Sequence, residues 1–354
     1  MKKFLFIHDI SQADLLNNKE SYINNFSNWV RCFTDWENTT EVAKWGGITP
    51  QQCQEFEYVM LLLMTDQRDE KLNKFLEIVA YPERKYKTIM YVDGVVGWQM
   101  NPFIVPNKEK YMDIVNASDY VFHYGLPESE GYWQVITRDR DLININRPHP
   151  IDTIKRVYDI EHPIDTEYIK QFTKEQQNII VVGKSLYNIN EERNAISSLY
   201  VAGKLQKITG WPVWVFANNP LPTDEVNHYY KSLCGIDEIK EIPVMPWNDY
   251  IKVLGICTVG IHLDCLETRG QFALDCAGLK IPLVCSGSVA GYNLYPQTWI
   301  PHCRNIENAL KKAYRLVQDK AFRKKVVDFA YKTVETYSFI ETKKKLEGIL
   351  GITI

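Results

Sequence analysis

The chain has 354 residues, of which 45% are hydrophobic and 24% charged, a composition that excludes a disordered or collagen-like protein. With 41 basic and 44 acidic residues the formal net charge is -3, so no global positive field draws the chain onto nucleic acid or anionic lipid. One hydrophobic core rarely serves a chain of this length, so we expect two domains.

The cysteine pattern and the lengths of the apolar runs indicate the cellular compartment in which the protein is expected to reside. The eight cysteines contain no Cys-x-x-Cys pair, which predicts reduced thiols in a cytoplasmic protein, or in the host-cell cytoplasm if the protein is viral. The apolar run at residues 4–7 is too short for a secretory signal. No apolar stretch is long enough to form a transmembrane segment.

In the first half of the chain, short apolar runs end in polar residues. They predict buried parallel strands at residues 3–7, 88–92 and 120–123. The run at residues 58–64 predicts either a further strand or a buried helix. The polar residues at or just after three of their carboxyl ends are His8, Asp9, Asp93 and His123. Ligands of open α/β sheets bind outside this edge, so candidate functional residues belong there.

A proline-containing stretch at residues 147–168 predicts the connection between two domains. Beyond it, further strands are predicted at residues 178–182, 213–217, 242–244, 260–263 and 281–285. The helices between and after them are predicted at residues 192–208, 249–254, 271–277 and 306–334. This alternation predicts two doubly wound, Rossmann-like α/β domains that face each other across a cleft, residues 1–160 and 161–337.

The most informative stretch is residues 264–285, which reads as a strand, an acidic loop, a glycine, a helix, and a proline that leads into another strand. Gly270 at the helix entrance lets backbone N–H groups approach a ligand, and a helix N-terminus favours an anion. Glu267 and Asp275 stand eight positions apart on either side of this turn. The arrangement suits a phosphate flanked by hydroxyl-bearing groups.

This stretch resembles the donor-binding segment of retaining GT-B glycosyltransferases, especially the glycogen-synthase-like family 4. The resemblance implies that Glu267 holds donor-sugar hydroxyls, that Thr268, Arg269 and Gly270 face the diphosphate, and that Asp275 accepts hydrogen bonds from the ribose. Two positions depart from the family pattern: Thr268 stands where the family has a glycine, and Asp275 where it has a glutamate.

Other segments extend the resemblance over residues 85–350. Gly183, Lys184 and Arg193 resemble the residues that neutralise the leaving diphosphate, where cations stabilise the charge that grows in the transition state. Trp247 either packs near the nucleotide base or belongs to the core. Residues 338–354 resemble the closing helix that packs back on the first domain.

In the first domain, the resemblance implies that Asp93 and His123 face the sugar and join Glu267 as the catalytic residues. His8 and Asp9 are assigned to the acceptor side. The alternative for all four first-domain residues is that they are ordinary strand-end residues whose side chains satisfy backbone groups.

Two further features have structural alternatives. Asp139 and Asp141 have the spacing of a metal-diphosphate motif, but we interpret them as a loop before a strand at residues 142–145. Lysines and arginines are dense over residues 311–345, where they form either a solvated helix face or a contact for a polyanionic or membrane-surface acceptor. Phosphate-loop, dinucleotide, serine-hydrolase and zinc motifs are absent from the sequence.

The predicted function is transfer of a hexosyl or pentosyl group from a nucleotide-diphosphate sugar, such as a UDP-sugar, to an acceptor hydroxyl. By resemblance the reaction is retaining and needs no metal, and the nucleotide sugar is a co-substrate rather than a cofactor. The predicted acceptor is a cell-envelope or lipid-linked glycan. Two alternatives stay open: a phage-type DNA glycosyltransferase that acts on a hydroxymethylated base, and a protein that binds nucleotide sugars without transferring them.

Overall fold

Two compact units make up the chain. The structure is a computed structural model, and it describes residues 2–8, 28–29, 31–32, 40–64, 69–93, 108–123, 157–186, 194–217, 226–243 and 245–353. Unit 1 comprises Met1–Pro163 and Phe339–Ile354, and unit 2 comprises Ile164–Ser338. The sequence places the corresponding boundaries after residues 160 and 337.

Unit 1 is built on a six-stranded sheet whose strands are all parallel. In spatial order the strands are β2 (Thr40–Lys44), β1 (Lys2–His8), β3 (Phe56–Met64), β4 (Lys87–Asp93), β5 (Tyr120–His123) and β6 (Val157–Asp159). Its helices are η1 (Trp45–Gly47), α4 (Pro50–Cys53), α5 (Asp69–Val79), α7 (Lys108–Ala117) and α18 (Phe339–Leu350).

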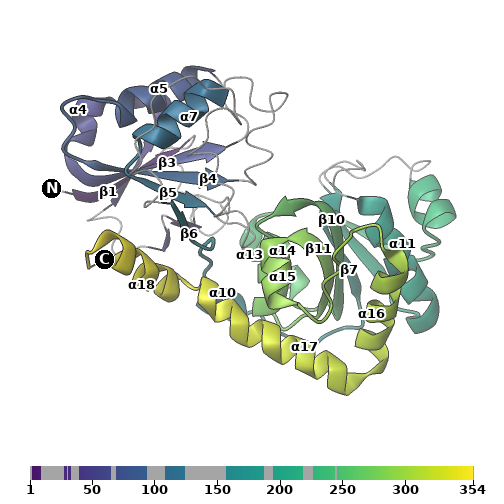
Figure 1. The fold of residues 1–354 in the computed structure, drawn as a ribbon. Helices are drawn as coiled ribbons and strands as arrows, with labels where there is room; N and C mark the ends of the chain where they lie inside the picture. Colours follow the sequence, from purple (N-terminus) through teal and green to yellow (C-terminus); the bar gives the residue numbers. More distant parts are fainter. Residues whose placement is uncertain are drawn as a thin grey trace. The chain divides into compact units, whose positions relative to one another are not determined.

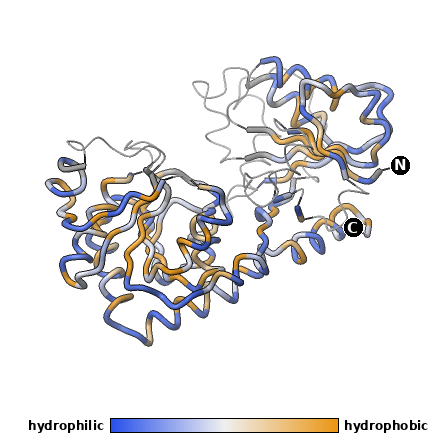
Figure 2. Tube along the Cα trace, turned by 180° about the vertical axis from the view of Figure 1, so that it is seen from behind, coloured by the Kyte–Doolittle hydropathy of each residue, from blue (hydrophilic) through white to orange (hydrophobic). Residues whose placement is uncertain are grey.

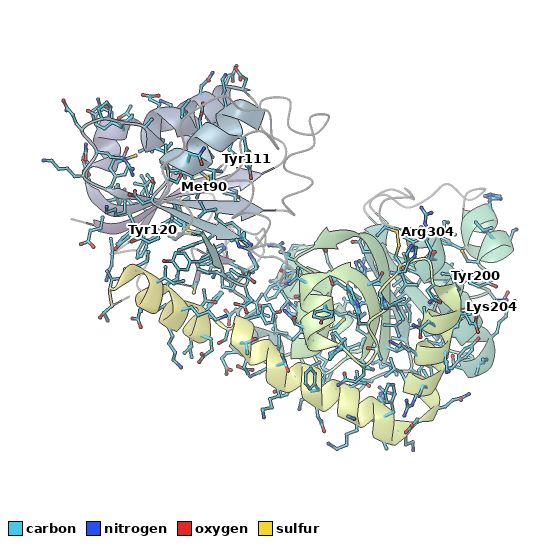
Figure 3. All side chains as sticks on the ribbon, in the orientation of Figure 1. Met90, Tyr111, Tyr120, Tyr200, Lys204 and Arg304 are labelled. Atoms are coloured by element: carbon cyan, nitrogen blue, oxygen red, sulfur yellow. A yellow bond between two sulfur atoms is a disulfide. The ribbon has the colours of Figure 1, made fainter. Side chains whose placement is uncertain are left out.

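Alternating side chains of β1 fill both faces of this sheet. Leu5 and Ile7 belong to the core that α5 and α7 cover, and this core also holds Met90 and Tyr111 (Figures 1 and 3). Phe4 lies on the other face, where its ring stacks on Tyr58 with the centroids 5.3 Å apart. The Tyr58 hydroxyl reaches the carbonyl of Leu350, which ties α18 to this second face.

Unit 2 contains a five-stranded parallel sheet. In spatial order its strands are β11 (Leu283–Ser288), β10 (Val259–Thr268), β7 (Ile180–Leu186), β8 (Val213–Ala217) and β9 (Ile239–Pro243). Its helices are α10 (Thr166–Lys170), α11 (Ala195–Thr209), η3 (Val226–Leu233), α13 (Trp247–Leu254), α14 (Gln271–Gly278), α15 (Val289–Leu294), α16 (Ile306–Gln318), α17 (Lys320–Thr333) and η4 (Val334–Tyr337).

Helices cover both faces of the unit 2 sheet, with α11 and α16 on one side and α14 and α15 on the other (Figure 1). The central strands are therefore enclosed, and Ile180, Val181 and Val182 are fully buried. Figure 2 shows the resulting pattern, with hydrophobic strands inside and hydrophilic residues on the outer helix faces. The outer face of α11 carries Tyr200 and Lys204, whose ammonium lies 5.0 Å from the centroid of the tyrosine ring (Figure 3).

The predicted fold class, two doubly wound α/β units each built on a parallel sheet, is confirmed. One predicted helix, residues 306–334, is wrong in detail because it is two helices. Asp319 ends α16 and its carboxylate accepts from the N–H of Phe322, which caps α17. Within the described part of the chain, every helix is too short or too polar to cross a membrane.

Candidate functional site

The carboxyl edge of the unit 2 sheet brings the predicted turn next to the start of a second helix. Thr268, the last residue of β10, is in register with Ser288, the last residue of β11. The carbonyl of Arg269 accepts a hydrogen bond from the N–H of Ala290, at 3.1 Å. The turn that leads into α14 is therefore fixed against the first turn of α15.

Gly270 occupies a position that only glycine fits. Its φ of +88° lies in the left-handed region, and a Cβ there would lie 2.8 Å from both Cβ and Oγ of Ser288. The Ser288 hydroxyl accepts from the N–H of Gly291, so it holds the start of α15 and is not free to move away. At the start of α14 the N–H groups of Ala273 and Leu274 donate to the Gly270 carbonyl, whereas those of Gln271 and Phe272 have no acceptor within the helix and favour an anion at this edge.

Asp275 lies on α14 and is fully buried. Its Oδ1 accepts from Nε2 of Gln271 at 2.8 Å and from the indole Nε1 of Trp247 at 3.4 Å. Trp247 is itself only 5% exposed and stacks on Tyr168, with the ring centroids 5.4 Å apart. The structure therefore places Trp247 in the core, where it holds a candidate site carboxylate, and the sequence alone did not link these two residues.

Gly183 on β7 makes room for a histidine that sequence reasoning missed. A Cβ on Gly183 would lie 2.1 Å from Nδ1 of His262 on the neighbouring strand β10. The His262 ring also packs on Phe272, and its Nε2 lies 3.5 Å from the buried Asp264 carboxylate. The i, i+2 spacing of His262 and Asp264 puts both side chains on the α14 face of the sheet.

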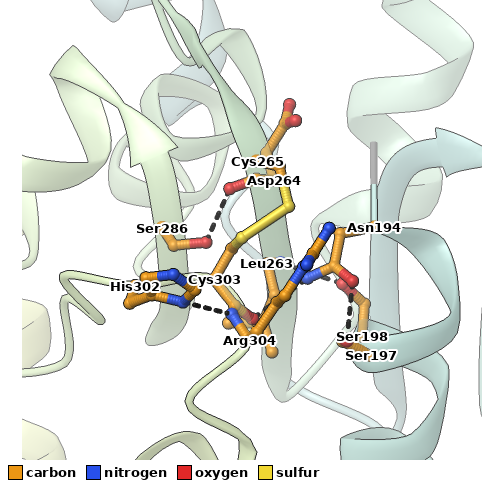
Figure 4. Close-up of a disulfide and its surroundings, with 10 residues drawn as sticks. All are labelled: Asn194, Ser197, Ser198, Leu263, Asp264, Cys265, Ser286, His302, Cys303 and Arg304. Carbon is orange, nitrogen blue, oxygen red and sulfur yellow. Dashed lines mark hydrogen bonds between the residues drawn. A yellow bond between two sulfur atoms is a disulfide. The ribbon is translucent and has the colours of Figure 1, made fainter. Parts of the chain in front are cut away.

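A disulfide joins Cys265 on β10 to Cys303, with the Cα atoms 5.5 Å apart (Figure 4). The expectation that all eight cysteines are reduced thiols is therefore wrong for this pair, while the other six are free and buried. The carbonyl of Cys303 accepts from Nδ2 of Asn194, which begins α11. The bridge thus links the strand that carries Glu267 to the residue that follows Arg193.

In unit 1, three predicted residues end neighbouring or near-neighbouring strands at the carboxyl edge of the sheet. These are His8 on β1, Asp93 on β4 and His123 on β5. Val92 is in register with His123, so Asp93 stands one position beyond it on the adjacent strand. His8 and His123 are both buried, at 5% and 1% exposure.

The His123 imidazole is uncharged at neutral pH. Burial lowers its pKa from the usual 6.5 to about 4. Neither ring nitrogen has a hydrogen-bond partner among the residues that the structure describes. A neutral imidazole whose nitrogens have no partner in these ranges can donate one hydrogen bond and accept another, but it cannot serve as a fixed cation.

The lowered pKa of His123 makes unit 1 sensitive to acid. The unfolded chain binds a proton near pH 6.5 and the folded chain only near pH 4, so the stabilisation is complete above pH 6.5 and is lost as the pH falls through 4. Between pH 8 and pH 4 we expect a loss of about 3 kcal/mol from this group. Urea unfolding of the wild type and of His123→Phe across this range measures it, because the variant lacks the titrating group.

The matched control for this experiment is His302→Gln, since His302 is exposed. It should keep the acid sensitivity of the wild type. A His123→Phe protein that loses stability with pH as steeply as the wild type would contradict the role of burial at His123.

Several predicted site residues are only partly covered by the structure. Asp9, Arg193, Asp139 and Asp141 lie outside the described residues, and so does the predicted strand at 142–145. For Lys184, Asp93 and Glu267 the backbone positions are described on β7, β4 and β10, and their side chains are not. In the described ranges, no group of three or more His, Cys, Asp or Glu side chains is arranged to hold a metal ion.

The basic residues between 311 and 345 lie on α16, α17 and α18, and several pair with acids of their own helix. The Nε of Arg315 lies 3.5 Å from Oδ2 of Asp319, and the Nζ of Lys344 lies 2.6 Å from Oε1 of Glu341. Lys324 forms an ion pair with Asp328. Such i, i+3 and i, i+4 pairs are typical of solvated helix faces.

Comparison with known proteins gives matches in structure only. No protein-family model matches the sequence. No curated protein matches it with significance. Among solved structures, the chain is similar to an α,α-trehalose-phosphate synthase (UDP-forming) from Burkholderia xenovorans in complex with glucose-6-phosphate, at 9% identity and a TM-score of 0.69, over 99% of this chain and 100% of that chain.

Two other similar structures contain UDP-glucose. HepE from Anabaena in complex with UDP-glucose has 9% identity and a TM-score of 0.64, with 99% of this chain and 100% of that chain covered. An α-glucosyltransferase in complex with UDP-glucose and DNA containing an abasic site has 10% identity and a TM-score of 0.63, with 99% of each chain covered. At such identities the likeness establishes the fold, and the features specific to family 4 stay predictions. The chain therefore has the GT-B fold of nucleotide-sugar glycosyltransferases.

Proposed function

We propose that the protein is a glycosyltransferase that moves a hexosyl or pentosyl group from a nucleotide-diphosphate sugar to an acceptor hydroxyl. The observation that carries this proposal is the turn at Gly270, where a left-handed glycine packed against Ser288 opens α14 at the carboxyl edge of the unit 2 sheet. In open α/β sheets this edge is where ligands bind. The match to structures that contain UDP-glucose, over nearly the whole chain, supports the same function.

In this proposal unit 2 binds the donor. The diphosphate lies at the N-terminus of α14, and Lys184 and Arg193 neutralise the charge that grows on it as the bond to the sugar breaks. Glu267 holds the sugar hydroxyls. The resemblance of residues 264–285 to retaining enzymes supports retention of the anomeric configuration and a reaction without a metal ion.

Unit 1 supplies the acceptor side. His8, Asp9, Asp93 and His123 are the residues that we assign to it. Because burial lowers the pKa of His123, its role is that of a neutral hydrogen-bonding group toward a hydroxyl. Exclusion of water from the donor is what separates transfer from hydrolysis, so acceptor binding is expected to precede or accompany bond cleavage.

The decisive experiment offers the purified protein a panel of nucleotide sugars with and without acceptors and measures nucleoside diphosphate release. We expect release from at least one donor, release that persists in EDTA, and a product with the anomeric configuration of the donor by NMR. A donor that binds and raises the melting temperature but is never cleaved would support the binding-only alternative. Absence of both binding and release across the panel would overturn the proposal.

The acceptor that we propose is a cell-envelope or lipid-linked glycan. We also propose that the protein itself is cytoplasmic. The second candidate is DNA with a hydroxymethylated base, favoured by one observation: a matched structure of nearly equal coverage is bound to DNA. The net charge of -3 weighs against DNA but does not exclude a local basic patch. Binding to hydroxymethylated duplexes at increasing salt separates the candidates, because phosphate contacts make affinity fall steeply with salt.

A further inference from the structure

The side chain that follows the Gly270 turn is Gln271, the first residue of α14. Its Nε2 donates to Oδ1 of Asp275 at 2.8 Å. The two residues are four positions apart on one helix, so their side chains lie on the same face one turn apart. Gln271 is the nearer of the two to the helix N-terminus, where the proposed diphosphate binds.

Asp275 and Trp247 fix this glutamine. The Asp275 carboxylate is fully buried, and the Trp247 indole donates to the same Oδ1 at 3.4 Å. Trp247 is held in turn by its stack on Tyr168. A fully enclosed aspartate, which has a shorter side chain than glutamate, is poorly placed to touch a ligand directly. It is well placed to hold the amide of Gln271.

The carbonyl oxygen at the other end of the Gln271 amide has no partner among the residues that the structure describes. Its Oε1 is buried and makes no hydrogen bond to any residue in the described ranges, although Gln271 as a whole is half-buried. A buried acceptor without a donor costs free energy, so such groups usually mark a missing partner. Because Nε2 is committed to Asp275, the group that completes Gln271 must be a hydrogen-bond donor.

We propose that Oε1 of Gln271 accepts a hydrogen bond from a hydroxyl group of the nucleotide-sugar donor, with Asp275 and Trp247 as positioning residues that present it. This inference rests on the proposed function and deepens it. A nucleotide sugar carries hydroxyl donors on the ribose and on the sugar, on either side of the diphosphate. The ribose is the expected source, and the experiment distinguishes the two.

The test combines a variant with deoxy analogues. Binding of UDP, 2′-deoxy-UDP, 3′-deoxy-UDP, UDP-glucose and deoxyglucose analogues of UDP-glucose is measured for the wild type and for Gln271→Leu. In the wild type, loss of the recognised hydroxyl should weaken binding about tenfold. In Gln271→Leu the same deletion should have little effect, because the acceptor is already gone. The position of the sensitive hydroxyl assigns it to the ribose or to the sugar.

Positioning is tested with Trp247→Phe and Asp275→Asn, read out as the same selectivity between hydroxyl and deoxy ligands. Both should reduce that selectivity while circular dichroism shows a folded protein. The control is Gln318→Leu at the exposed end of α16, which should keep wild-type selectivity. Undiminished selectivity in Gln271→Leu would overturn this role alone. Failure of the wild type to bind UDP, ADP or GDP would overturn the proposed function together with it.

Discussion

Gly270→Ala is expected to lower the melting temperature of unit 2 by roughly 5–15 °C and to weaken donor binding at least about tenfold. A left-handed backbone costs a residue with a Cβ about 1–2 kcal/mol, and overpacking typically adds about 1–3 kcal/mol. Both apply here, since φ is +88° and the added Cβ would lie 2.8 Å from Ser288. Relief requires the turn to move, and that movement displaces the backbone N–H groups proposed to bind the diphosphate.

Calorimetry of the unfolding transitions and titration with the donor measure the two effects separately. The matched control is Gly348→Ala on α18, where an added Cβ meets nothing within 4 Å. Alanine favours a helix interior over glycine, so this variant should be as stable as the wild type or slightly more so. Unchanged donor affinity in Gly270→Ala would show that the diphosphate does not bind at this turn.

Apolar runs that end in polar residues predicted most of the strands that position the candidate site. The run at residues 213–217 matches β8 (Val213–Ala217), and the runs at 88–92 and 120–123 match β4 and β5. Such runs are readable because a parallel sheet covered on both faces must be apolar on both. The short β2 and β6 were not predicted, since they lie at the sheet edges and carry no continuous apolar run.

The site itself was readable only where a local backbone requirement leaves a mark in the sequence. Gly270 leaves such a mark, because a helix start with φ of +88° and no room for a Cβ beside Ser288 needs glycine. The contact between Trp247 and Asp275, and the room that Gly183 leaves for His262, join distant segments and have no local signature.

Two sequence patterns indicate features that the prediction missed, the contact of Gln271 with Asp275 and the break between α16 and α17. Gln271 stands four positions before Asp275, the spacing at which side chains on a helix meet. Asp319 stands just before the second of two helical segments, where an aspartate is a favoured N-cap.

Reduction of the bridge between Cys265 and Cys303 is expected to destabilise unit 2 by about 4 kcal/mol, which lowers its melting temperature by roughly 8–15 °C. The bridge spans 38 residues, so opening it restores a large loop entropy to the unfolded chain. Calorimetry with and without tris(2-carboxyethyl)phosphine measures the change. The double variant Cys265→Ser with Cys303→Ser should melt at the lower temperature and ignore the reductant.

Alkylation followed by mass spectrometry identifies which thiols the reductant releases. Cys265 and Cys303 are partly exposed, whereas the other six cysteines are buried, and burial raises the pKa of Cys32 and Cys53 to about 12. Thiolate is the reactive form, so only the bridge cysteines should label quickly in the folded, reduced protein. Rapid labelling of both before reduction would show that the bridge is open and would contradict this prediction. In that case the loop from β10 to α16 is held by packing alone, and the melting temperature should not respond to the reductant.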